Sequence, residues 1–559
     1  MRGITLGFIL LFSAPALALD FGLNGHYRFR SELSHDLDTQ THNRGITHDN
    51  DRFGMIQFNQ MRLRMGPIIK VNDFLSVHSE FDILDNVMFG TNTNKNMEIL
   101  SPVVGTLTLP SGSGTIGQVG GVAGENAAIE VRRAWMDILT PIGKFRLGRQ
   151  PSHWGLGIFA NDGDSRQGDF GDNVDRILYL AQIELQRNDA LTIGLAWDVP
   201  FEAGPNPRVQ GLGGTVRDNG QDTKQFAGIL LYEQPDFTLG TLSGVRLRSG
   251  SSGNTMTATD AKGNVVASGI DGNTTLGFAD LYGRAAVGDV TVRTELAALF
   301  GKITTGLAID AIPFSSFSSS GSGAGIIQLP AKQTMRAFLA ALEIEGIHDW
   351  GGEWLVRSGY ASGDDTPLST RVTQYGFRPD YQIAMMMFHR PIGSSPSLYG
   401  GTASNTGTSS KLTGGVPITG NFINNALYLS LGYKHKLDVT SAIPHADWFK
   451  IGGNVTTAWA PKKNVSLDFA TLLNNGNLPT LSENAGSVWK RWYGVEFDFG
   501  IEASFFENLF TNFELGLLIP GKEYNIDVNP TDPGNIIDTI PVDKASPAVA
   551  ARLTAMIEF

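Results

Sequence analysis

The sequence has no cysteine in its 559 residues, which excludes disulfides, thiol catalysis and cysteine-ligated metals. Beyond its first dozen positions it has no uninterrupted apolar run of about 18 residues, so membrane-spanning helices are not expected. Positive charge is in deficit, with 43 Lys and Arg against 55 Asp and Glu and a formal net charge of −12. That balance argues against a nucleic-acid binder, which needs a basic surface. No proline-rich or charged linker divides the chain, so we expect one domain.

Enzyme signatures are missing as well. The sequence contains no G-x-S-x-G, no H-E-x-x-H and no glycine-rich phosphate loop. Its ten histidines are scattered, and no pair has obvious ligand spacing within a predicted strand. We expect no enzyme and no cofactor. A Ser/His/Asp site assembled from several strands stays open as an alternative, because such sites are recognised by geometry.

The first 18 residues have the pattern of a cleaved export signal. Arg2 precedes an apolar run from Ile4 to Phe12, and the ALA at 16–18 fits the A-x-A cleavage rule. The run is too short to cross a membrane as a stable helix. A signal anchor or an ordinary buried strand is the alternative interpretation. We expect export and a mature domain spanning 19–559.

Glycine is abundant, with 67 residues, and accompanies one recurring pattern. Two alternating segments of about ten residues meet at a short polar turn, and a longer Gly/Ser/Asn/Asp stretch follows. Short turns on one side and long loops on the other are typical of an outer-membrane barrel. The predicted short turns are at 71–74, 141–144, 187–190, 234–237, 287–290 and 348–352, and the clearest long segments are 91–128, 200–222, 305–332, 391–422 and 521–548.

Alternation assigns the two faces of these strands. Val495, Phe497 and Phe499 alternate with Glu496 and Asp498, for example. In a membrane barrel the apolar face meets lipid and the charged face lines a water-filled interior, and the sheet must close because lipid satisfies no backbone group. We predict an all-β fold, a transmembrane antiparallel up-and-down β-barrel of about 18 strands (16–20), with short periplasmic turns and long extracellular loops. The sequence pattern of residues 381–447 is compatible with either a strand or a loop.

The final segment ARLTAMIEF, residues 551–559, continues the alternation to its last position. Leu553, Ile557 and Phe559 fall on the apolar side, and Arg552 falls on the other. We expect this strand to pair with the first one, near residues 19–30. Phe559 then faces lipid and serves as an assembly signal.

Inward-facing charges are the best candidates for function. An aqueous lumen is the reasonable place for them, because Arg facing lipid at mid-membrane costs about 2–4 kcal/mol. In one interpretation these charges pair across neighbouring strands and only hydrate the wall. In the other, a ladder of arginines selects and guides anionic solutes. The candidates are Arg28, Arg30, Arg62, Arg64, Arg146, Arg246, Arg248, Arg293, Arg336, Arg357, Glu80, Asp82, Glu295 and Glu353, and the same alternation turns Glu184, Glu343, Glu496, Asp498 and Glu514 inward.

An acidic loop, FANDGDSRQGDFGDNVDR at 159–176, is the second candidate. Its aspartates on a flexible glycine-rich segment suit Ca²⁺, with Asp162, Asp164 and Asp169 as candidate ligands. The spacing does not match an EF-hand loop. A solvated acidic loop without metal is the interpretation we prefer.

Two short motifs carry a family resemblance. GYASGDDTP at 359–367, with Gly363, Asp364 and Asp365, is followed by YGFRP at 375–379, and RLGRQ at 146–150 contains Arg149. These segments resemble motifs of the alginate-export family of outer-membrane barrels. The resemblance implies a monomeric barrel of about 18 strands that passes solutes by diffusion, in some members alginate through an arginine-rich lumen. This chain departs from that pattern, because its predicted lumen has nearly as many acids as arginines.

These observations together predict a porin-like channel in the outer membrane of a Gram-negative bacterium. It would pass small hydrophilic solutes, anionic or carbohydrate ones included. Its expected partners are outer-membrane lipid, lipopolysaccharide, the barrel assembly machinery and the solute, with no nucleic acid. The alternatives are a structural or adhesive barrel with a plugged lumen, to which 91–128 or 391–422 would contribute, and an outer-membrane hydrolase.

Overall fold

The structure is a computed structural model. It describes residues 19–37, 55–88, 129–185, 188–201, 223–248, 258–259, 265–267, 273–304, 332–365, 370–390, 392, 422–438, 443–462, 491–521 and 546–559. Residues 1–18, where we predict the export signal, and the proposed plug segment 91–128 lie outside this set. Among the described residues no helix is long and apolar enough to cross a membrane.

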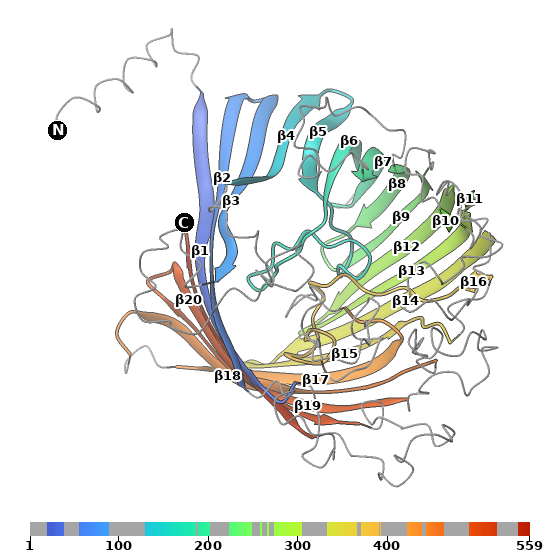
Figure 1. The fold of residues 1–559 in the computed structure, drawn as a ribbon. Coiled ribbons are helices and arrows are strands. Elements are labelled where there is room, and N and C mark those ends of the chain that lie inside the picture. Colours follow the sequence, from blue (N-terminus) through green and yellow to red (C-terminus); the bar gives the residue numbers. More distant parts are fainter. Residues whose placement is uncertain are drawn as a thin grey trace, which may run out of the picture.

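Twenty-one strands make up the described fold, and all but two belong to one sheet (Figure 1). The first nine are β1 (Asp20–His35), β2 (Met55–Asn72), β3 (Leu75–Met88), β4 (Glu130–Thr140), β5 (Gly143–Pro151), β6 (Asn173–Glu184), β7 (Ala190–Phe201), β8 (Thr223–Glu233) and β9 (Phe237–Arg248). The others are β10 (Ala258–Thr259), β11 (Val265–Ala267), β12 (Thr274–Val287), β13 (Val290–Thr304), β14 (Lys332–Ile347), β15 (Gly352–Ala361), β16 (Arg371–Val372), β17 (Ala426–Leu437), β18 (Ala446–Trp459), β19 (Trp492–Phe505), β20 (Leu509–Pro520) and β21 (Ala548–Glu558).

The sheet closes into an antiparallel up-and-down barrel. Each wall strand pairs with its neighbour in the chain, and β21 pairs with β1 from Val549–His35 to Glu558–His26. Gly25 and Phe559 then exchange backbone hydrogen bonds of 2.8 and 3.0 Å. The sheet has 19 strands, and the two-residue β16 only extends the rim beside β14, so 18 strands form the wall. The predicted fold class, strand number and closure of the last strand on the first are confirmed.

The outer face of the barrel is apolar. On β7, for example, the outward residues Ile193, Leu195 and Trp197 are 38–61% exposed, and similar exposed apolar side chains recur on the other wall strands. Phe559 is half exposed on the same face, with its ring close to Gly25. A barrel placed in lipid needs this exterior.

Short connections gather at one end of the barrel and long ones at the other. The predicted turns at 71–74, 141–144, 234–237, 287–290 and 348–352 are all present, and the 187–190 turn lies between β6 and β7. The ambiguous region 381–447 divides into a loop up to residue 392, whose Met385–Met387 are buried, and the strand β17.

Candidate functional site

Two segments leave the long-loop end of the wall and fold into the interior of the barrel (Figure 1). The first inward loop comprises residues 152–172, between β5 and β6. The second comprises residues 370–390, between β15 and β17. Both contain fully buried apolar side chains, such as Ile158 in the first and Met386 in the second. They cross the space into which the inward charges point, so they define the candidate site.

Three arginines of β1 and β2 converge on one aspartate of the first inward loop. Oδ1 of Asp169 lies 2.5 Å from Arg28 Nη2 and 3.3 Å from Arg62 Nη2, and its Oδ2 lies 2.7 Å from Arg30 Nη2. Arg28 and Arg62 also donate to the carbonyl oxygen of Gly168, at 3.1 and 2.9 Å. All four charged side chains are 1–2% exposed. We call Arg28, Arg30, Arg62 and Asp169 the arginine cluster.

Asp169 is held ionised by its neighbours. Burial alone would raise the pKa of its carboxyl, but the positive charges of Arg30, Arg28 and Arg62 outweigh burial and hold the pKa well below its usual range. Asp169 is the carboxylate that all three guanidinium groups share, and two further carboxylates each contact one of them, Asp85 at 2.5 Å from Arg62 Nε and Glu32 at 3.2 Å from Arg30 Nε. Removing the Asp169 charge would leave the arginines of this cluster without their shared counter-ion.

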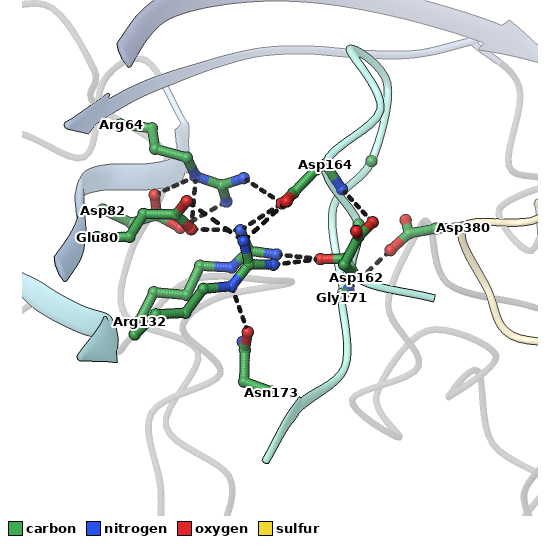
Figure 2. A network of polar contacts seen from close by, with 12 residues as sticks. Arg64, Glu80, Asp82, Arg132, Asp162, Asp164, Gly171, Asn173 and Asp380 are labelled. Atoms are coloured by element: carbon green, nitrogen blue, oxygen red, sulfur yellow. Dashed lines mark hydrogen bonds and ion pairs between the residues drawn. The ribbon is translucent and has the colours of Figure 1, made fainter. Parts of the chain in front are cut away.

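Two adjacent arginines of β4 bind the same loop, and Figure 2 shows Arg132 with its partners Asp162 and Asp164. The register of β3 against β4 shifts between Glu80 and Phe81, so Glu80 pairs with Arg133 while Phe81 pairs with Val131. The extra residue, Arg132, therefore points inward together with Arg133, because a bulge re-aims side chains. Each donates through Nη2 to the carbonyl oxygen of Asp162 at 2.6 Å and through Nη1 to the Asp164 carboxylate at 3.1 or 2.8 Å.

Acidic residues hold the other end of the first inward loop. The Glu295 carboxylate on β13 accepts hydrogen bonds from the backbone N–H groups of Leu156 at 2.5 Å and Phe159 at 3.2 Å. Beside it on β12, Asp280 Oδ1 accepts from the Trp154 indole at 3.2 Å. The loop thus reaches from the arginines of β1, β2 and β4 to the carboxylates of β12 and β13.

The wall holds the second inward loop by the same two kinds of contact, carboxylates that accept from loop N–H groups and arginines that donate to loop oxygens. Glu496 on β19 accepts from the backbone N–H groups of Met386 and Met387, both at 2.6 Å. Arg357 on β15 donates to the carbonyl oxygens of Gln382 and Ile383, both at 2.8 Å. Wall carboxylates therefore hold loop N–H groups, and wall arginines hold loop oxygens.

Asp380 joins the two loops to each other. Its carboxylate accepts from the backbone N–H groups of three consecutive residues, Asp169 at 2.8 Å, Phe170 at 3.0 Å and Gly171 at 2.7 Å. Figure 2 shows Asp380 beside Gly171. Arg378 adds an ion pair of 2.7 Å with Asp172, whose pKa burial raises. The loops are therefore one connected structure inside the barrel.

The predicted inward residues lie inward with one exception. Arg64 pairs with Asp82 at 2.6 Å and Arg146 with Asp137 at 2.7 Å, directly across neighbouring strands as the hydration interpretation expects. Arg336 was assigned wrongly. It is exposed on the outer face with Phe338, while Met335 and Ala337 beside it are buried, and its place near the loop end of β14 avoids mid-membrane lipid. The inward ones are Arg28, Arg30, Arg62, Arg64, Arg146, Arg246, Arg248, Arg293, Arg357, Glu80, Asp82, Glu295 and Glu353.

The acidic loop is not the solvated segment that we preferred. Asp169 is buried by three arginines, Asp164 contacts Arg132 and Arg133, and Asp162 pairs with His153 at 3.4 Å. Within the described ranges no group of three or more His, Asp or Glu side chains has an arrangement suited to a metal ion. The arginines account for the aspartates of this loop, so Ca²⁺ is not needed to explain them.

The residues of the family motifs have structural partners. The Asp364 carboxylate accepts from the backbone N–H of Thr373 at 3.1 Å, and the Gly363 carbonyl accepts from its hydroxyl at 2.7 Å. Asp365 pairs with Lys462 at 3.3 Å. The motif thus ties the end of β15 to the start of the second inward loop. Arg149 instead pairs with Asp175 on the outer face, at 2.8 Å, and both are half exposed.

Sequence reasoning missed Arg132, Arg133, Asp280 and Asp380. Strict alternation turns one of two adjacent arginines outward, and only a bulge brings both inward. The adjacent pair of arginines at 132–133 was the available signal. Asp280 lies at an inward position of a predicted strand, whereas Asp380 lies in a segment with no periodicity and left no signal.

Comparisons with known proteins find only distant structural similarities. No protein-family model matches it, and no curated protein matches either. Solved structures similar to it include OccK11 (OpdR) of Pseudomonas aeruginosa, at 10% identity and a TM-score of 0.41, with 96% of each chain covered. OccAB2 of Acinetobacter baumannii is similar at 10% identity and a TM-score of 0.40, covering 96% of this chain and 98% of that one. An anion-selective porin from Comamonas acidovorans is similar at 8% identity and a TM-score of 0.36, covering 97% of this chain and 100% of that one. These values are too low to assign a function.

Proposed function

We propose that the protein is an outer-membrane channel for passive diffusion of small hydrophilic solutes, narrowed by two docked inward loops. The observation that carries this proposal is the division of the closed wall into an apolar outer face and an ionic inner face. Charges on the inner face are compatible with a water-filled lumen, and the apolar exterior is compatible with lipid. The anchored loops would set how wide the path is.

The solute preference that we propose is for small anions, and it rests on two arginines outside the arginine cluster. Arg246 donates to the Gln225 side-chain oxygen, at 3.0 Å from Nε and 2.7 Å from Nη2, and Arg248 is exposed two residues further along β9. Among the described residues, neither is within ion-pair distance of a carboxylate. Arg28, Arg30 and Arg62 are already paired with Asp169, so they are poor contacts for a passing polyanion such as alginate.

The test is single-channel conductance of the refolded protein in a planar bilayer under a salt gradient. We expect steady steps with an anion preference, and a shift towards cations in the Arg246→Gln/Arg248→Gln double variant. Arg149→Gln is the control, because Arg149 lies on the outer face and should leave the selectivity unchanged. An unchanged reversal potential in the double variant would contradict the anion preference.

A structural or adhesive barrel with a plugged lumen is the second candidate. The observation in its favour is that Met386, Met387 and Ile158 pack as buried residues within the barrel. A folded, heat-modifiable protein that gives no conductance steps would support this candidate. An assay panel of lipid, peptide and glycoside substrates would then test the hydrolase alternative.

We also propose that Phe559 contributes to assembly by closing β21 on β1. Deleting Phe559 removes both backbone hydrogen bonds to Gly25. We expect less folded barrel in the outer-membrane fraction, measured by heat-modifiable migration. Phe559→Leu keeps the backbone bonds and serves as the control. Equal amounts of folded barrel in all three proteins would refute the assembly role.

A further inference from the structure

The outer face of β12–β15 has an uneven distribution of charge. Its outward positions are apolar, Gly, Ser or Thr over most of their length, and none of those described is Asp or Glu. The cations at its described outward positions are Lys302, Lys332 and Arg336, all at the loop end, and Lys302 and Arg336 are exposed. In a chain of net charge −12, a face that carries cations alone at one level is unusual.

A further cation, Arg371, joins them through β16. Lys302 on β13 lies opposite Thr334 on β14, and Arg371 on β16 lies opposite the same Thr334 on the other side. Directly paired residues point to the same face, so Lys302 and the exposed Arg371 flank Thr334 at about two strand spacings, ~10 Å. Arg336 is the next outward residue along β14 and lies between them. We call Lys302, Arg336 and Arg371 the outer basic patch.

An aromatic collar lies beneath this patch on the same strands. Phe300 and Phe338 are 54% and 45% exposed, and the Phe338 ring is 6.2 Å from that of Tyr360. In sequence order each lies two residues nearer the middle of its strand than a patch cation, Phe300 before Lys302 and Phe338 after Arg336. Cations above exposed aromatic rings match the border between phosphate headgroups and acyl chains.

We propose that the outer basic patch binds a phosphorylated glycolipid of the lipopolysaccharide type in the leaflet at the long-loop end. This inference rests on the proposed placement in the outer membrane. Three cations within about 10 Å suit a headgroup with more than one phosphate, because each guanidinium or ammonium adds a charge-assisted hydrogen bond. The acyl chains would then lie along Phe300 and Phe338. Arg149, at the same end of the barrel, pairs with Asp175 at 2.8 Å and does not belong to the patch, so it serves as the reference cation.

The experiment measures lipid retained by the detergent-purified, folded full chain by native mass spectrometry. The probes are bisphosphorylated lipid A, its dephosphorylated form, phosphatidylethanolamine and inorganic pyrophosphate. We expect retention of bisphosphorylated lipid A, at least tenfold less in the Lys302→Gln/Arg336→Gln/Arg371→Gln variant, and no change in Arg149→Gln. Equal retention by the triple variant, equal retention of the dephosphorylated form, or an equal loss in Arg149→Gln would overturn the proposal. Pyrophosphate binding without lipid A binding would also overturn it, because the site would then recognise free phosphate.

Conductance of the same samples separates this inference from the proposed function. The patch faces away from the lumen, so we expect the triple variant to conduct like the wild type while losing the lipid. If the triple variant does not fold, the single variants Lys302→Gln and Arg336→Gln are measured in its place. Wild-type retention in both singles would count against the patch. A conducting protein that binds no lipid A would leave the channel intact and reject the site.

Discussion

Two sides of the lumen hold the first inward loop, an arginine side on β1, β2 and β4 and an acidic side on β12 and β13. They bind different groups of the loop. On β1, β2 and β4, arginines bind the loop through the Asp169 and Asp164 carboxylates and backbone carbonyls. On β13, Glu295 binds only backbone N–H groups. The arginine side therefore depends on the aspartates of the loop, whereas the acidic side uses the loop backbone and one loop side chain, the Trp154 indole that donates to Asp280. Substitutions of the loop aspartates should disturb the arginine side, and substitutions in the wall can disturb either side.

Asp169→Asn should have the largest effect, because it removes the shared counter-ion of three buried arginines. Removing one partner of a buried ion pair costs about 3–5 kcal/mol. We expect the folded barrel, measured by its heat-modifiable migration, to be lost at a lower temperature. We also expect larger or noisier conductance steps, because the first inward loop would detach from the wall. Asp175→Asn is the matched control, because its half-exposed pair with Arg149 is worth at most about 1 kcal/mol. Similar results for both variants would mean that the arginine cluster does not anchor the loop.

Glu295→Gln should have an intermediate effect and tests the acidic side. The neutral amide still offers one oxygen but loses charge-assisted bonds, each worth about 1.5–3 kcal/mol. We expect faster hydrogen exchange at Leu156 and Phe159 with normal protection at residues 169–171. Glu345→Gln, which changes a half-exposed partner of Arg293, is the control. Equal loss of protection at both ends would show that the two sides release together.

Gly171→Ala should lower the stability of the barrel by less than Glu295→Gln does. It tests the arginine side again. Gly171 has a φ of 59°, and an added Cβ would lie 2.2 Å from Arg132 Nη2 and 2.3 Å from the Asp162 oxygen. Backbone strain of this kind costs about 1–3 kcal/mol. Gly288→Ala is a close control, because Gly288 has a φ of 58° with nothing within 4 Å of the new Cβ. A drop in thermal stability no larger than that of Gly288→Ala would exclude crowding against Arg132.

The smallest effect should come from pH at the His153–Asp162 pair. The hydrogen bond to Asp162 outweighs burial and raises the pKa of His153. A raised pKa means that the pair stabilises the loop fully below the ordinary value near 6.5 and that this contribution is lost as pH rises through the raised value. We expect slightly more conductance noise at pH 9 than at pH 6, and no such difference in His153→Gln. An unchanged pH dependence in the variant would assign the effect elsewhere.

The strands of the wall could be predicted from the sequence because apolar and polar residues alternate with a period of two. Each strand repeats this pattern several times. Phe497 and Glu496 reveal their faces without any knowledge of distant residues. The inward loops could not, because docking depends on contacts such as Asp380 with residues 169–171, which no local pattern encodes. The Arg132–Arg133 bulge and the outward Arg336 show the limits of alternation at strand ends. Most inward charges of the wall were predicted correctly, but the loop residues that bind them were not.

The Asp380 contact also constrains the order of events during biogenesis. Asp380 lies 211 residues after Asp169, beyond eight wall strands from β6 to β15, and the arginines that hold Asp169 are on the first two strands. Contacts of such long sequence separation form late, because chain entropy opposes them until intervening segments are in place. The Asp380 contact to the first inward loop would therefore form only after the second loop arrives, later than the contacts of the first loop with β1, β2 and β4. A barrel captured before β15 has joined the sheet would have an interior more open than that of the finished protein.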